Sequence, residues 1–154
     1  NLRMATVGDY VEQWAEEMDP LLLWRIEQAQ QFSLRDFGKA ENARSALYQR
    51  VREFFTTYDL LLLPTTPMLP YPAQESYPTV VAGRTISNPY EILLLTYAFN
   101  LTGQPAISVP AGWTEEGLPV GLQIVGRRYA ETLVLKAAAA FEAAVPWTER
   151  YPPL

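Results

Sequence analysis

Four consecutive leucines occupy residues 60–63, between Asp59 and Pro64. A short run that is apolar at every position is typical of a β-strand covered on both faces, because a strand with one face in water alternates apolar and polar residues. Such a strand needs other structure above and below it. The run therefore predicts a layered α/β fold in which helices flank a sheet.

Three helices are predicted before this strand, so residues 1–58 are expected to be mainly helical. Apolar residues at helical spacing predict an amphipathic helix over residues 7–18 that ends near Pro20, and a short second helix is expected over residues 21–32. Ser33, followed three residues later by Asp36, resembles a capping box. This pair predicts the start of a long third helix that ends near Thr57.

Residues 59–126 are expected to hold strands, a proline-rich loop and a hairpin. Five prolines between residues 64 and 78 predict a stiff excursion without regular structure, since proline fixes φ and removes a backbone donor. Asn88 and Pro89 predict the start of a short helix that runs through about Thr96. A turn over residues 99–105 should then lead into the strands.

The strands of the expected hairpin cover residues 106–109 and 120–125, with a turn at residues 115–117. An alanine-rich pattern predicts a final helix over residues 129–145. Residues 1–154 are accordingly interpreted as one segment of one domain, built from these three stretches.

The chain has no histidine and no cysteine among its 154 residues. It therefore cannot form a Ser-His-Asp triad, a disulfide framework or a sulfur-ligated metal site. No P-loop or dinucleotide-binding motif is present, so no cofactor or metal is predicted. The absence of cysteine favours a cytoplasmic location.

The formal net charge of −5 argues against binding to nucleic acid, which needs a clustered cationic surface. The pair Arg127 and Arg128 is too small to reverse this balance. No apolar run approaches the roughly 20 residues of a membrane-spanning helix. Neither a nucleic acid nor a membrane is therefore expected as a partner.

The two lysines, Lys39 and Lys136, fall on helix faces that are expected to be solvated. A Ser-Lys pair can replace histidine as a catalytic base, but no serine of this chain occupies a strained, glycine-rich turn. No catalytic residue is therefore assigned. The chain begins at Asn1 and not at methionine, which suggests a fragment, a processed chain or one component of a larger protein.

Uncharged turns beside strand ends are where α/β proteins often bind ligands, and residues 88–126 have this character. Asn100, Thr102 and Gln104 supply polar groups there among aromatic and apolar neighbours. Two interpretations are equally supported by the pattern alone. These residues either line a binding site or satisfy the hydrogen bonds of a buried turn.

Two runs within this stretch carry a family resemblance: residues 99–110 read FNLTGQPAISVP, and residues 117–126 read GLPVGLQIVG. Together with DLLLLPTTP at residues 59–67 and the terminal helix before Pro146 and Trp147, they resemble the carboxy-terminal block of the amidase-signature family. The resemblance implies part of a mixed central β-sheet with flanking helices. It also implies the hydrolysis of a small-molecule carboxamide to an acid and ammonia or an amine.

Family members use a serine nucleophile, a second serine in a cis peptide and a lysine base, all in a Gly/Ser-rich region amino-terminal to the block that matches here. This sequence has no Gly-Gly-Ser-Ser run. The resemblance thus implies that this chain contributes sheet and a wall of the substrate pocket, and that it is inactive in isolation. Its expected partner is an amino-terminal amidase portion that carries the catalytic residues, or further copies of itself.

The resemblance places the acyl side of the substrate pocket near the turn and the helix before it. In the amidase-type component of glutamyl-tRNA amidotransferases, an acidic residue there holds the substrate's amino group, and Leu93 stands at the matching position. A leucine favours an uncharged or aromatic amide. The substrate-pocket candidates are Leu93, Tyr97, Phe99, Asn100, Thr102, Gly103 and Gln104.

An alternative from another class remains open. The chain is then a non-catalytic binding or scaffolding module that has kept the sheet and lost the chemistry. For an isolated chain, strands without neighbours leave exposed sheet edges, which predict oligomerisation or poor solubility.

Overall fold

A computed structural model describes residues 8–147, except Ser76 and Ser87. The chain divides into two compact units, Asn1–Ala43 and Arg44–Leu154. No helix among the described residues is long and apolar enough to cross a membrane.

The first unit begins with three short helical pieces: η1 (Gly8–Tyr10), α2 (Val11–Trp14) and η2 (Ala15–Glu17). The prediction of one continuous helix over residues 7–18 is therefore wrong, and residue 7 lies outside the described part. The break falls at Trp14, whose φ of −132° and ψ of 13° leave the α region. Each of the three pieces is only three or four residues long, and the helix type changes between them. The apolar residues therefore do not follow one continuous period of 3.6 residues.

The second predicted helix is confirmed as α3 (Pro20–Gln30). Asp19 is its N-cap, and one of its carboxylate oxygens accepts hydrogen bonds from the main-chain nitrogens of Leu21 and Leu22 at 2.9 and 3.1 Å. Pro20 fills the first helical position, where a missing N–H costs no hydrogen bond.

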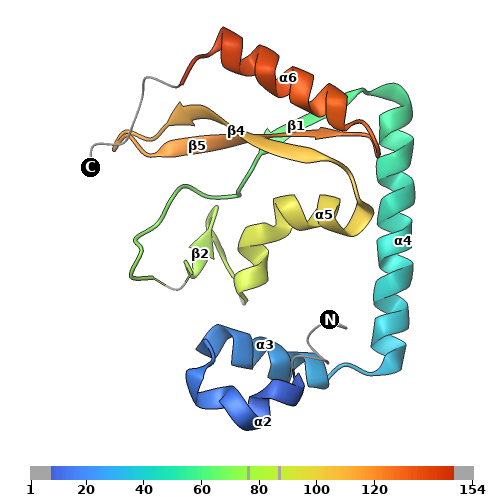
Figure 1. Ribbon diagram of the computed structural model, residues 1–154, viewed down its shortest axis with the longest axis vertical. Helices are drawn as coiled ribbons and strands as arrows, with labels where there is room; N and C mark the ends of the chain where they lie inside the picture. Colours follow the sequence, from blue (N-terminus) through green and yellow to red (C-terminus); the bar gives the residue numbers. More distant parts are fainter. Residues whose placement is uncertain (1–7, 76, 87, 148–154) are drawn as a thin grey trace. The chain divides into compact units, whose positions relative to one another are not determined.

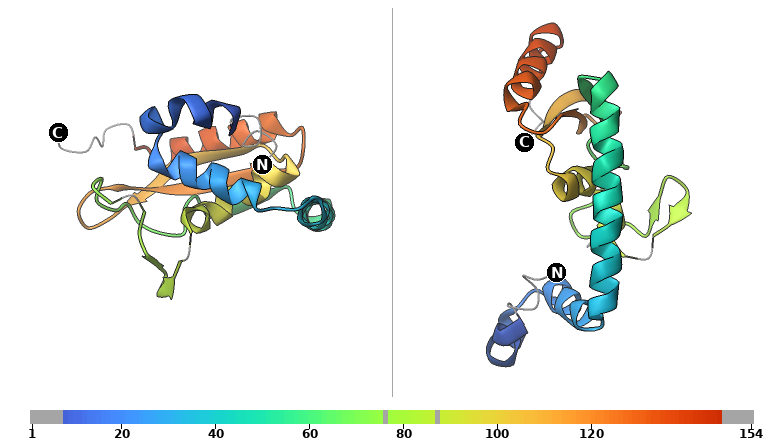
Figure 2. Two further views of the ribbon diagram at one scale, coloured as in Figure 1. Left: turned by 90° about the horizontal axis from the view of Figure 1, so that it is seen from below. Right: turned by 90° about the vertical axis from the view of Figure 1, so that its right-hand side faces the viewer.

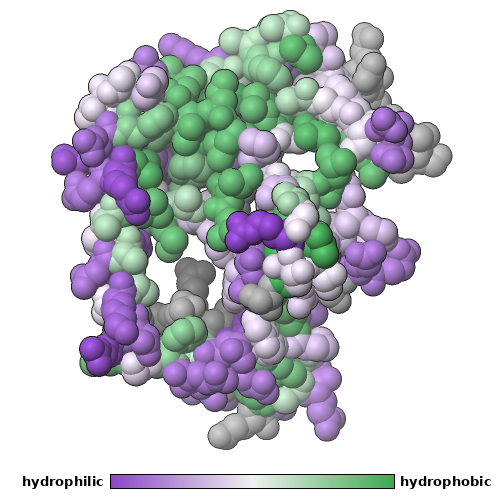
Figure 3. All heavy atoms as spheres, turned by 180° about the vertical axis from the view of Figure 1, so that it is seen from behind, coloured by the Kyte–Doolittle hydropathy of each residue, from purple (hydrophilic) through white to green (hydrophobic). Residues whose placement is uncertain are grey.

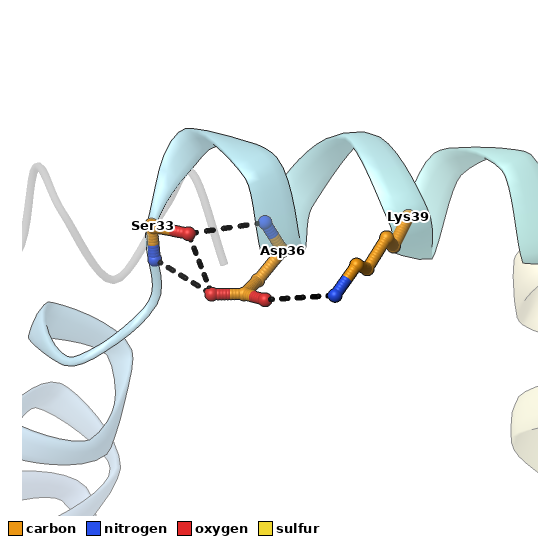
Figure 4. Close-up of polar contacts among 3 residues, drawn as sticks. All are labelled: Ser33, Asp36 and Lys39. Atoms are coloured by element: carbon orange, nitrogen blue, oxygen red, sulfur yellow. Dashed lines mark hydrogen bonds and ion pairs between the residues drawn. The ribbon is translucent and has the colours of Figure 1, made fainter.

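The long helix α4 (Leu34–Thr57) ends at the predicted residue and begins at the predicted capping box. The Ser33 hydroxyl accepts from the main-chain nitrogen of Asp36 at 3.2 Å, and the Asp36 carboxylate accepts from the main-chain nitrogen and the hydroxyl of Ser33 (Figure 4). Lys39 lies 3.9 Å from the same carboxylate. The main-chain N–H groups of Ser33 and Asp36, which have no partner within the helix, are thus hydrogen-bonded by nearby side chains.

The second unit is built on an antiparallel sheet of three strands in the order β1-β5-β4 (Figure 1). These strands are β1 (Leu60–Pro64), β4 (Ala106–Trp113) and β5 (Pro119–Gly126), so all three predicted strands are confirmed. The turn between β4 and β5 contains Gly117 at a φ of 83°. The central strand β5 is the most deeply buried of the three.

Helix α6 (Glu131–Ala144) confirms the helix that the alanine-rich terminal pattern predicts. It lies against β4 and β5 (Figure 1). The core on this side consists of Val109, Ile124 and Ala138. The helix and sheet approach closely at Gly126, where an added Cβ would lie 2.7 Å from a methyl carbon of Val134. A side chain at position 126 would therefore push α6 from the sheet.

The helix before β4 consists of η3 (Pro89–Leu93) and α5 (Leu94–Thr102), with Asn88 as N-cap. The predicted end near Thr96 is wrong, because six further residues, 97–102, are helical. Phe99 is buried within this extension. Its burial stabilises a helical conformation that the local turn propensity does not predict. Gly103 then ends the helix at a φ of 75°, a left-handed conformation that favours glycine.

The proline-rich stretch after β1 has no regular element among its described residues, as predicted. A short hairpin that was not predicted follows, formed by β2 (Val80–Val81) and β3 (Arg84–Thr85). Figure 2 shows this hairpin projecting away from the three-stranded sheet. Two-residue strands are too short to give a recognisable sequence period.

Strand β1 is an edge strand, and the prediction that its leucines are covered on both faces is wrong for this chain. Leu62 pairs with Ile124, yet its side chain is 57% exposed. Helix α6 packs on β4 and β5, the other two strands of the sheet, and so leaves Leu62 uncovered. Figure 3 shows hydrophobic residues gathered over this part of the molecule.

Candidate functional site

An apolar cavity of about 340 Å³ lies beside the amino-terminal end of α5 and is called the Leu93 cavity. It is formed by the chain after β1, the end of η3 and the start of β5. Among the described residues, no charged side chain lines it. Its lining residues are Thr66, Met68, Leu69, Pro70, Tyr71, Ile92, Leu93, Pro119, Val120 and Gly121.

One edge of the Leu93 cavity depends on the absence of a side chain at Gly121. A Cβ at this position would lie 2.7 Å from the hydroxyl oxygens of both Thr65 and Ser108. These two hydroxyls are hydrogen-bonded to each other at 2.6 Å, and the main-chain nitrogen of Thr65 donates to the main-chain oxygen of Gly121 at 3.0 Å. The glycine thus allows three segments to meet at the edge of the cavity: the chain after β1 at Thr65, β4 at Ser108 and β5 at Gly121.

The predicted site residues do not converge on one place. Leu93 precedes α5, whereas Asn100, Thr102 and Gly103 lie at the end of this nine-residue helix, roughly 13 Å away at 1.5 Å per residue. Of the seven candidates, Leu93 alone lines the apolar cavity. The sequence pattern could not separate Leu93 from the candidates at the end of α5, because it does not predict a helix at residues 97–102.

Several of the other candidates have structural partners. Thr102 and Gln104 are 4% and 9% exposed, and their side chains hydrogen-bond to each other. The Thr102 hydroxyl also contacts the main-chain oxygen of Ala98 at 2.7 Å. Tyr97 packs against the ring of Tyr90 at 6.0 Å. These contacts support the interpretation that Thr102 and Gln104 satisfy a buried turn.

Asn100, Thr102 and Gly103 also line a second cavity, of about 460 Å³, together with residues of α4 and the segment after β5. Gln104 lines a third cavity of about 260 Å³. Tyr48 and Arg128 line both, so the two adjoin and are called the arginine cavities. Their cationic lining residues are Arg44, Arg52, Arg127 and Arg128.

Arg128 lies near the rings of two tyrosines. Its guanidinium carbon lies 5.7 Å from the ring centroid of Tyr48 and 5.1 Å from that of Tyr129. The interaction with the Tyr48 side chain, and then the charge of Tyr129, raise the pKa of Arg128 above its usual value. The pair Arg127 and Arg128 alone predicts no cationic surface. The spacing of Arg44, Tyr48 and Arg52, however, places these three on one face of α4.

Neither lysine lines any of these cavities. Lys39 is exposed and pairs with Asp36, and Lys136 is exposed on α6. The described residues contain no group of three or more His, Cys, Asp or Glu placed to hold a metal ion.

The fold and the sequence together define the family. Residues 5–135 match the family described as Amidase, which is most of the chain. The chain therefore belongs to the amidase-signature family, and its helix-and-sheet architecture is that of amidase-signature enzymes.

Among curated relatives, the chain is similar to an acylamidase of Rhodococcus erythropolis, with 35% identity over 136 residues, covering 88% of this chain and 28% of the relative. It is 38% identical over 121 residues to the A component of the glutamyl-tRNA(Gln) amidotransferase of Dehalococcoides mccartyi, covering 77% of this chain and 23% of that protein.

Among solved structures, a bacterial aryl acylamidase superposes with a TM-score of 0.85 at 28% identity, covering 97% of this chain and 32% of that one. A 6-aminohexanoate cyclic dimer hydrolase with bound substrate gives 0.74 at 32% identity, covering 89% and 30%. The chain thus spans less than a third of the length of each of these proteins.

Proposed function

We propose that this chain is the carboxy-terminal portion of an amidase that hydrolyses a neutral carboxamide, and that the Leu93 cavity is a wall of the pocket for the acyl group. The observation that carries the proposal is the lining of this cavity, which is apolar and lacks a charged side chain among the described residues. A charged substrate group would lose its hydration there without gaining a partner. An aliphatic or aromatic acyl group would instead gain from burial.

The names of similar proteins support this choice of substrate class. The relative from Rhodococcus erythropolis is an acylamidase, and a structural neighbour is an aryl acylamidase. The amidotransferase relatives are comparable in sequence identity. An apolar residue at position 93 favours the acylamidase type of substrate over a zwitterion such as glutamine.

The catalytic groups are proposed to come from a portion of the protein outside these 154 residues. Neither lysine lies at the described cavities. In the complete enzyme a serine would attack the carbonyl, and backbone donors would stabilise the oxyanion. The C–N bond would then break, so that ammonia or an amine leaves with a proton and an acyl-enzyme remains. Water would finally attack this ester, releasing the acid and regenerating the serine. This chain would position the substrate for those steps.

The first test uses the chain alone, at an intact mass of 17.4 kDa, with a panel of aliphatic and aromatic amides. No hydrolysis is expected. Hydrolysis by material of that mass would contradict the proposal that the catalytic groups lie outside this chain.

The second test replaces the matching segment of the Rhodococcus acylamidase with this chain and measures kcat/KM for a neutral aryl amide. Leu93→Asp in the chimera should lower this value by about tenfold or more, because the pocket then holds an uncompensated charge. Leu135→Asp, at an exposed position of α6, is the matched control. Equal effects of the two changes would show that the Leu93 cavity is not part of the substrate pocket.

The same chimera separates the proposal from its alternative. A folded chimera that hydrolyses the amide supports a contribution to an active amidase. A folded chimera without activity would favour a non-catalytic binding or scaffolding module.

A further inference from the structure

The arginine cavities concentrate positive charge in a chain whose formal net charge is −5. Arg52 comes from α4, and Arg127 and Arg128 come from the segment between β5 and α6. No aspartate or glutamate is among the described residues that line either cavity. Neighbouring like charges repel one another, and a bound anion relieves this repulsion.

Arg128 is the best-positioned of these groups. Its guanidinium lies near the rings of Tyr48 and Tyr129, and its Nη2 donates to the Tyr129 hydroxyl at 3.4 Å. Gly103 leaves room for it at the end of α5. A Cβ at Gly103 would lie only 3.4 Å from Nε of Arg128. Nearby aromatic rings attract the cation, and a planar guanidinium presents its N–H groups in a fixed fork that suits a carboxylate or a phosphate.

The cavities also supply neutral hydrogen-bonding groups. Ser45, Gln49 and Asn100 line the larger cavity, and Thr56 lines the smaller one. Such groups fix the orientation of a ligand whose charge is neutralised by arginine. The two volumes, about 460 and 260 Å³, are large enough for a small molecule.

From this arrangement we infer that the arginine cavities form a binding site for a small anionic molecule bearing a phosphate or carboxylate group, with Arg128 as the central contact and Arg52 and Arg127 beside it. The site is separate from the Leu93 cavity, since the two share no lining residue among those described. It does not depend on the proposed amidase activity.

The test is a nuclear magnetic resonance titration of the full 154-residue chain with inorganic phosphate and, separately, with succinate. Sodium chloride at equal ionic strength is the reference, because simple screening acts on all exposed charges. Saturable shifts are expected for the Arg128 Nε–H group and the Gly103 amide. A stronger response to one probe identifies phosphate or carboxylate as the preferred group.

Arg128→Gln should weaken the binding by about tenfold or more, since it removes a charged hydrogen-bonding partner. Arg84→Gln, on the exposed strand β3, is the matched control and should leave the affinity unchanged. Should Arg128→Gln disturb the fold, Arg52→Gln provides the same comparison from α4. Shifts that only follow ionic strength, or equal binding by the variants and the parent chain, would overturn the inference.

Discussion

The side-chain Nε2 of Gln123 donates a hydrogen bond to the main-chain oxygen of Leu95 at 3.1 Å. Gln123 lies in the central strand β5 and is 4% exposed, and Leu95 lies in the first turn of α5. The bond therefore ties the helix to the sheet. Because Leu93 lies just before α5 and Gly103 just after it, this single contact helps to position the linings of both candidate sites.

Gln123→Met keeps the approximate volume of the side chain but removes its donor. The free energy of unfolding should fall by about 1–3 kcal/mol, since the side chain is buried and its hydrogen bond to Leu95 is lost. Chemical denaturation measures the change. Gln49→Met, at an exposed position of α4, is the control and should have little effect. Equal stability of the Gln123 variant and the parent would show that α5 is held by apolar packing alone.

Gly121→Ala should destabilise the sheet by about 1–3 kcal/mol, because its methyl group would lie 2.7 Å from two hydroxyl oxygens. Gly112→Ala, in the neighbouring strand β4, has open space around its added methyl group and serves as the control. Thermal unfolding of the two variants makes the comparison. A smaller loss for Gly121 than for Gly112 would contradict the close packing of Thr65 and Ser108 beneath the cavity.

Gly38→Ala should stabilise α4 by about 0.5–1 kcal/mol, because glycine in an exposed helix interior costs more backbone entropy than alanine. Nothing lies within 4 Å of the position of the added Cβ. Ala40→Gly, an exposed site of the same helix, should cause a loss of similar size. Helical circular dichroism during denaturation reports both changes, and a destabilising Gly38→Ala would show an unseen contact at this position.

The capping box at Ser33 should make α4 sensitive to acid. Hydrogen bonds from the Ser33 hydroxyl, and then from its main-chain nitrogen, hold the pKa of Asp36 below its usual value of 3.8. A carboxyl group with a lowered folded-state pKa stabilises the folded state above its unfolded-state pKa, and this contribution is lost as the pH falls through the folded-state pKa. The contribution is thus complete at neutral pH and declines below about pH 4.

Ser33→Ala tests this relationship, because it removes the hydroxyl partner of Asp36. The variant should be less stable than the parent near neutral pH, and the difference should shrink in acid. Unfolding curves recorded at several pH values measure it. A difference that stays constant across the acid range would mean that the Asp36 carboxylate does not take part in the cap.

Leu62→Glu should reduce self-association of the chain without lowering its stability. Leu62 is 57% exposed on the edge strand β1, and a charge on an edge strand opposes pairing with another copy. Sedimentation velocity over a range of concentrations provides the measurement. Leu135→Glu, on α6 and 59% exposed, is the control. If the parent chain is monomeric at every concentration, the prediction of a homo-oligomer is wrong.

Local signals in the sequence predicted much of the secondary structure. The Ser33–Asp36 pair marks the start of α4, because a capping box needs only residues within one turn. The wholly apolar run at residues 60–63 predicted β1, and the turn at residues 115–117 predicted that β5 follows it. The resemblance of residues 99–126 to the amidase-signature family predicted the family that the comparisons confirm.

Contacts between distant segments decided the rest. The burial of Phe99 extends α5 beyond its local turn signals, and the place of β1 at the edge of the sheet leaves Leu62 exposed despite its wholly apolar run. Arg52 and Arg128 are far apart in the sequence and line one cavity only because α4 and the end of β5 come together. Local propensity acts over a few residues, whereas burial and charge clustering depend on which segments pack against each other, and only the tertiary structure fixes that.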